Sequence, residues 1–150
     1  MPTAYKVLRG NGTEFESINS YDCARVVYRK GKLAKPPKWL ADEGFGLFCF
    51  RTPENAVEFI RNEVMAPMTI FVCEVEYQNE VPLPQWRSIF LLAQGIISPP
   101  YETIKFPVGS FTVSSLTITH VLMSALRDPL RHLYWTAIDI GQEKIPSDSL

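Results

Sequence analysis

The chain lacks the features that mark several classes of protein. No apolar run approaches the ~20 residues that a helix needs to cross a membrane. The opening MPTAYKVLRG has no hydrophobic core of the signal-peptide type. The formal net charge over 150 residues is only −1, so bulk charge excludes a strongly basic nucleic-acid coat and a strongly acidic mimic. We therefore expect a soluble, cytoplasmic protein with no membrane contact.

Cysteine and histidine are also scarce. The three cysteines, Cys23, Cys49 and Cys73, are an odd number without CxxC spacing. The two histidines, His120 and His132, do not form an HxxxH pattern. A zinc site needs closely paired ligands of these types. The sequence therefore predicts reduced, buried thiols and no metal site.

What is present is the composition of a folded domain. Hydrophobic residues make up 46% and charged residues 21% of the chain, close to the averages for soluble globular proteins. At this length we expect a single domain over residues 1–150. We place its core at about 4–118, a C-terminal helical extension at about 119–140 and a frayed tail at 141–150.

The first third reads as short strands. Residues 4–10, 13–18 and 24–31 are rich in strand-forming residues, and GNG between the first two is a turn signal. We predict a meander of three strands. Residues 32–44 contain adjacent prolines, which a central strand does not tolerate. They predict a surface loop with Trp39 and Leu40 turned inward.

A strand followed by a helix is the clearest local pattern. FGLFCF, residues 45–50, is apolar on both faces and suits a central strand. Thr52 is a good N-cap and Pro53 suits the first helical position. Apolar residues then recur at helical spacing up to Val64. We predict a helix at about 53–64 and a further strand at 68–77.

The C-terminal third is less regular. Residues 85–96 favour a helix weakly, and residues 111–118 alternate as a strand does. Residues 119–138 are rich in Leu, Met and Ala, which favours a helix kinked near Pro129. The predicted fold is α+β: a mainly antiparallel twisted sheet with one helix on a face and a C-terminal helix. That last helix is also a candidate homodimer interface.

The densest chemical feature is a basic run. Six of the 15 Lys and Arg residues fall within residues 25–38, without an acid among them. Lysine, arginine and interleaved aromatic rings are suited to phosphates and bases. A solvated hairpin whose lysines protect an edge strand is the alternative. The predicted ligand-binding residues are Arg25, Tyr28, Arg29, Lys30, Lys32, Lys35 and Lys38.

Other polar pairs are weaker signals. Glu74 and Glu76 share one face of a strand, where paired carboxylates can serve acid–base chemistry. A strand end whose acids face water explains them equally simply. Asp128 precedes His132 by four residues, but Pro129 between them is expected to distort a helical relay. GxSxG is absent.

Several of these segments together resemble a loose group of small single-domain proteins of phages, mobile elements and microbial genomes. The shared features are the strand AYKVLR, the proline-containing loop, GLFCFRTPENAVEFI, TIFVCEVE and PVGSFTVSSLTI. The resemblance covers roughly residues 4–118. It implies an architecture and supplies no mechanism.

A more distant similarity is to ADP-ribosyltransferase-like folds. There, a first-strand arginine, a serine-bearing strand and a late glutamate surround nicotinamide adenine dinucleotide. Arg9, Ser17, Glu74 and Glu76 are the matching residues here, but no STS-type motif is present and Ser17 comes early. This similarity implies an alternative enzyme that acts on NAD, with Arg9 and Glu76 as catalytic residues.

The leading functional hypothesis is a non-enzymatic accessory or binding protein without a cofactor. It would contact a phosphate-bearing small molecule, a nucleic acid or an acidic protein through the basic run. A structural protein that oligomerises through its C-terminal helix is a further alternative.

Overall fold

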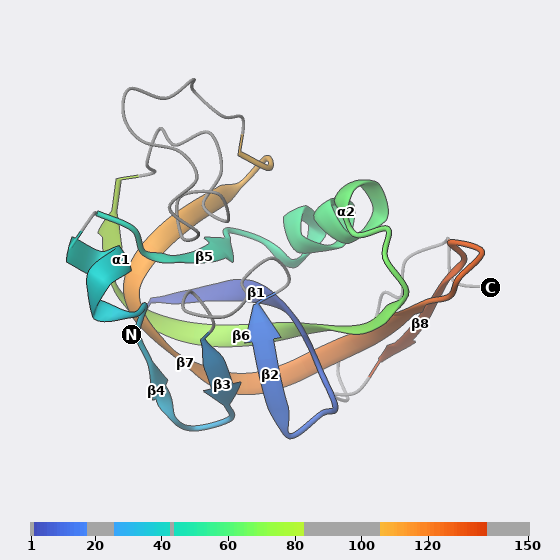
Figure 1. Cartoon of the computed structure of the whole chain (residues 1–150), viewed down its shortest axis with the longest axis horizontal. Helices are drawn as coiled ribbons and strands as arrows, with labels where there is room; N and C mark the ends of the chain where they lie inside the picture. The colour runs from blue at the N-terminus through green and yellow to red at the C-terminus, as the bar shows by residue number, and fades with distance from the viewer. Residues whose placement is uncertain (1, 18–25, 43, 83–105, 138–150) are drawn as a thin grey trace.

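The structure is a computed structural model that describes residues 2–17, 26–42, 44–82 and 106–137. Within these ranges the chain forms one eight-stranded sheet and two helices (Figure 1). Their bounds are β1 (Thr3–Gly10), β2 (Glu14–Ser17), β3 (Val27–Arg29), β4 (Leu33–Ala34), α1 (Lys38–Asp42), β5 (Leu47–Phe50), α2 (Pro53–Glu63), β6 (Met68–Val81), β7 (Ser110–Arg127) and β8 (Leu133–Ala137).

The sheet curls until it closes on itself. β1 pairs with both β5 and β6, and β7 pairs with the same two strands, so these four form a ring of antiparallel pairings. β2 and β3 extend the sheet from β1, while β4 and β8 add to β7. β6 and β7 run side by side along most of their length as long curved strands (Figure 1). The predicted antiparallel sheet and its N-terminal meander are confirmed.

Two apolar clusters lie on the two sides of this curved sheet. The inner one fills the ring with side chains from β1 to β7, including Phe15, Cys49 and Cys73, which are fully buried. The outer one packs α2 against β1, β5, β6, β7 and β8. Strands buried on both faces explain the apolar runs without alternation.

The helix α2 begins and faces the sheet as predicted. The Thr52 hydroxyl accepts a hydrogen bond from the Asn55 amide at 3.1 Å, and Pro53 occupies the first turn. Ala56, Val57 and Ile60 are buried against the sheet. An N-cap of this kind stabilises a helix by about 1 kcal/mol. Local signals were sufficient for this element.

The predicted C-terminal helix is wrong. Residues from Thr119 to Arg127 continue β7, and Leu133–Ala137 form β8, which pairs back onto it. Pro129 lies in the turn between the two strands. Pairing with β6 on one edge and β8 on the other outweighs the weak helical preference of Leu, Met and Ala. The homodimer prediction loses the helix on which it rested.

The predicted loop at 32–44 also contains secondary structure. Leu33–Ala34 pair with β7 as β4, and Lys38–Asp42 form the short helix α1. Leu40 is buried, as expected, but Trp39 is 37% exposed. Consecutive helical residues point about 100° apart, and the side of α1 that buries Leu40 leaves Trp39 partly exposed.

Some predictions fall outside the described residues: the segment 85–96, Cys23, Arg25 and the tail from 138. Neither helix of the described ranges is long and apolar enough to cross a membrane.

Candidate functional site

The turn between β3 and β4 carries the centre of the basic run. β3 pairs with β2, and β4 pairs with β7. The turn forms at Gly31, whose φ of 80° favours glycine. The Lys32 amide donates to the Arg29 carbonyl at 3.0 Å, and the Gly31 amide donates to the Ile118 carbonyl of β7 at 2.9 Å. Lys30 and Lys32 therefore flank a turn that is fixed against β7, and both are exposed.

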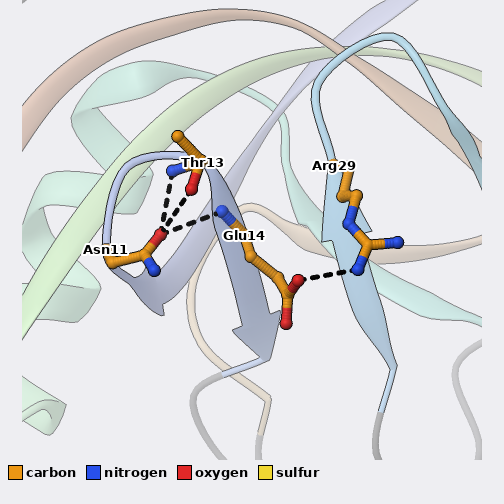
Figure 2. A network of polar contacts seen from close by, with 4 residues as sticks. All are labelled: Asn11, Thr13, Glu14 and Arg29. Atoms are coloured by element: carbon orange, nitrogen blue, oxygen red, sulfur yellow. Dashed lines mark hydrogen bonds and ion pairs between the residues drawn. The ribbon is translucent and has the colours of Figure 1, made fainter.

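Two of the predicted cations are neutralised by neighbouring carboxylates. Figure 2 shows Arg29 of β3 reaching Glu14 of β2. The distance from Arg29 Nη2 to Glu14 Oε2 is 2.7 Å. Asn11 supports this arrangement, because its Oδ1 accepts hydrogen bonds from the amides of Thr13 and Glu14 (Figure 2).

At the other end of the segment, Lys38 pairs with Asp42 one helical turn away at 2.8 Å. The remaining three lysines, Lys30, Lys32 and Lys35, form no ion pair with another residue of the described ranges and are exposed. Their charge is free to meet an anion from solution.

Tyr28, the aromatic residue among the predicted ligand-binding residues, does not lie on this exposed surface. It is only 1% exposed and points into the ring, opposite Phe15 on β2. Its hydroxyl lies 3.3 Å from the Ser17 hydroxyl. The β3 alternation that exposes Arg29 turns Tyr28 inward. Tyr28 is therefore a core residue, and the structure does not bring it together with the exposed lysines.

A buried lysine accompanies Tyr28 inside the ring. Lys6 is 4% exposed, and its Nζ donates to the Phe48 carbonyl and lies 5.3 Å from the centre of the Tyr28 ring. β1 and β5 share only the pairing of Tyr5 with Phe50. The Lys6 ammonium therefore links β1 to β5 by a hydrogen bond where these two strands are sparsely paired. This is a structural role.

The alternative catalytic pair is not brought together. In the β1–β6 register, Arg9 lies opposite Ile70, whereas Glu76 lies opposite Thr3. Six residues of strand separate these positions, or about 20 Å. Arg9 instead pairs with Glu16 of β2 at 3.1 Å.

A different polar pair, which the sequence did not reveal, lies on the outer face where β6 leaves the cover of α2. Glu74 Oε1 lies 3.2 Å from Nδ1 of His120 on β7. Two register shifts between β6 and β7, at Val72/Cys73 and Glu74/Val75, flank this position. Irregularities of this kind re-aim side chains and are frequent beside functional sites.

Tyr5 lies on the other side of Glu74 from His120. Tyr5 of β1 lies opposite Glu74, so Tyr5, Glu74 and His120 form a row across three strands. Burial raises the pKa of the Tyr5 phenol, and the negative charges of Glu74 and Glu54 raise it further. Tyr5 is therefore a neutral hydrogen-bond donor at neutral pH.

A hollow of about 320 Å³ lies between α2 and the segment 106–108. Its polar lining consists of Asn55, Asn62, Glu58 and Glu63, with Phe59, Phe106, Pro107 and Val108 as the apolar part. Carboxylates without a cation disfavour an anionic ligand there.

No protein-family model, curated protein or solved structure matches the chain. Function must therefore be argued from the site.

Proposed function

We propose that this protein binds single-stranded nucleic acid through the lysines of its β3–β4 turn and the segment that follows. The observation that carries the proposal is which cations of this segment form ion pairs. Lys30, Lys32 and Lys35 are exposed and have no carboxylate partner within the described ranges, while neighbouring Arg29 and Lys38 do. Unpaired surface lysines supply the phosphate contacts that dominate nucleic-acid affinity.

Exposed apolar side chains in the same segment favour a nucleic acid over an acidic protein. Leu33 is 59% exposed and Trp39 is 37% exposed. Bases that stack on an aromatic ring must be unpaired, and such stacking is worth about 1–3 kcal/mol per base. A single strand offers both the phosphates and the free bases. The competing interpretation is that these lysines bind no ligand and only keep the surface solvated.

Fluorescence anisotropy with a labelled strand of about 20 nucleotides tests the proposal, since single-stranded sites span about 4–16 nucleotides. The wild-type protein should bind at low salt, and the triple variant K30E/K32E/K35E should lose binding. A charge-matched comparison uses two double variants that each reverse two charges: K30E/K32E at unpaired lysines and R29E/K38E at residues that are already paired. R29E/K38E should bind more tightly than K30E/K32E. Equal binding by the wild type and the triple variant would overturn the proposal.

A further inference from the structure

The pair Glu74–His120 has a defined proton arrangement. The Thr119 hydroxyl donates its hydrogen to the Glu74 carbonyl at 3.1 Å, so towards His120 it can only accept. An ionised Glu74 carboxylate can only accept as well. His120 Nδ1 lies 3.2 Å from Glu74 Oε1 and 3.3 Å from Thr119 Oγ1. We therefore assign the proton of the neutral imidazole to Nδ1.

This tautomer leaves a basic nitrogen on the other edge of the ring. Nε2 of a neutral imidazole with hydrogen on Nδ1 carries the lone pair. No described residue forms a hydrogen bond to Nε2, and the His120 side chain is 55% exposed. A carboxylate that holds Nδ1–H orients the ring and stabilises the imidazolium formed when Nε2 takes up a proton.

The charges around His120 are divided between its two sides. Across the sheet the order is β1, β6, β7, β4. Glu74 and Glu76 lie on the β6 side, while the lysine turn lies on the β4 side. Gly31 of that turn contacts Ile118, which is two residues from His120, or roughly 7 Å along the strand. His120 lies at the boundary, with the acids on one side and Lys30 and Lys32 on the other.

We infer that His120 is the general base of an RNA-cleaving site, with Glu74 as its positioning residue. The inference rests on the proposed nucleic-acid binding and extends it. RNA carries its own nucleophile, the 2′-hydroxyl. A base that accepts the proton of this hydroxyl promotes its attack on the adjacent phosphate, and nearby lysines stabilise the growing negative charge.

The step balances without a co-reactant. Nε2 of His120 takes the proton of the 2′-hydroxyl, and the 2′-oxygen forms a bond to the adjacent phosphorus. The bond between phosphorus and the 5′-oxygen breaks, and that oxygen takes a proton from water. The imidazolium returns its proton to solvent. The products are one strand ending in a 2′,3′-cyclic phosphate and one beginning with a 5′-hydroxyl.

The test uses a labelled single-stranded RNA and the same sequence with 2′-O-methyl groups, which cannot supply the nucleophile. RNA should be cleaved and the 2′-O-methyl strand should be bound and left intact. Mass spectrometry should find the cyclic phosphate. His120→Gln should slow cleavage at least ~100-fold, since general base catalysis contributes about 10²–10⁴. It should leave the affinity for the 2′-O-methyl strand within about twofold.

The chain offers a matched control. His132 also has its Nδ1 3.2 Å from a carboxylate, that of Asp128, and its side chain is 61% exposed. It lies in the β7–β8 turn, away from the β3–β4 turn that carries Lys30 and Lys32. His132→Gln should cleave RNA at the wild-type rate. Glu74→Gln should lower kcat without raising KM, because it disturbs the base and not the phosphate contacts.

The outcomes separate the two proposals. RNA that is bound but stays intact overturns the cleavage inference and leaves the binding function standing. Equal cleavage by the wild type and His120→Gln, prepared in parallel, also overturns the inference. Failure to bind either strand overturns the proposed function.

Discussion

The guanidinium of Arg127 caps the end of α2 by donating from Nε to the Val64 carbonyl at 2.9 Å. Its Nη2 donates to the Ile60 carbonyl at 2.9 Å, and its Nη1 to the Arg131 carbonyl at 2.7 Å. The last carbonyls of a helix lack intrahelical partners, and the helix dipole is negative there. One buried cation at the end of β7 therefore ties the helix to the sheet.

Replacing Arg127 should lower the stability of the folded protein. Arg127→Met keeps much of the apolar stem and removes the donors, which leaves buried carbonyls unsatisfied. We expect a loss of about 3 kcal/mol in the free energy of unfolding, measured by urea denaturation. Arg131 has an exposed side chain in the same turn. Arg131→Met should change the free energy of unfolding by no more than about 0.5 kcal/mol. Equal stability of Arg127→Met and the wild type would contradict the capping role.

Gly109 should be intolerant of a side chain. Its φ is 76°, and a Cβ there would overlap the Asn55 side chain. Asn55 cannot rotate away freely, because its Oδ1 accepts from the Thr52 hydroxyl at 2.8 Å in the N-cap of α2. Gly109→Ala should lose about 1–2 kcal/mol of stability from backbone strain, and about 1 kcal/mol more from the cap.

The control for Gly109 is Gly44, which has φ of 88° and open space around the position of a Cβ. Gly44→Ala should show the backbone cost alone. If thermal or urea unfolding finds equal losses of stability for the two variants, the Asn55 contact does not contribute to the cost of Gly109→Ala.

The Cys49 thiol should be unreactive in the native protein. Burial raises its pKa from 9.0 to about 11, although the charge of Lys6 acts in the opposite direction. At pH 8 the thiolate fraction should therefore be about 100-fold lower in the folded than in the unfolded chain. Peptide-resolved mass spectrometry of iodoacetamide labelling, with and without guanidinium chloride, measures this difference. Similar labelling rates would refute it.

The same shift predicts a pH dependence of stability. The unfolded thiol ionises near pH 9, whereas the folded thiol stays protonated until about pH 11. Between these values the unfolded chain binds fewer protons, so stability falls as the pH rises. The contribution is complete below about pH 9. Cys49→Ala should flatten this part of the stability profile, and an unchanged slope from pH 9 to pH 11 would contradict it.

Trp39 should contribute to binding more than to folding. It is 37% exposed, whereas Trp135 is 8% exposed in the cluster under α2. Trp39→Ala should weaken single-stranded RNA binding by about 1–3 kcal/mol if a base stacks on the indole. Trp135→Phe should lower stability and leave the affinity unchanged. Anisotropy titrations that find wild-type affinity for Trp39→Ala would exclude stacking at this position.

The sequence predicted elements whose signals are local. Thr52, Pro53 and the apolar face up to Val64 lie within one short segment, and α2 forms there. A strand was also predicted from Met68, and β6 begins there. Both inferences depend only on neighbours along the chain and on side-chain periodicity.

The errors and omissions come from contacts between distant residues. Leu126 and Met123 favour a helix by composition, but β6 and β8 pair with them from elsewhere in the sequence. Glu74 and His120 are 46 positions apart. Their contact depends on the β6–β7 register and its bulges, which no local pattern specifies. The fold class was therefore accessible from the sequence, and the polar pair was not.

The most direct measurement of the central claim is the salt dependence of single-stranded RNA affinity. Each lysine–phosphate contact contributes about 0.7 to the slope of log K against log salt for a single strand. The variant K30A/K32A/K35A should therefore have a slope shallower than the wild type by about 2, if all three lysines meet phosphates. An unchanged slope, with the fold intact by circular dichroism, would show that these three lysines are only solvated and would contradict the proposed function.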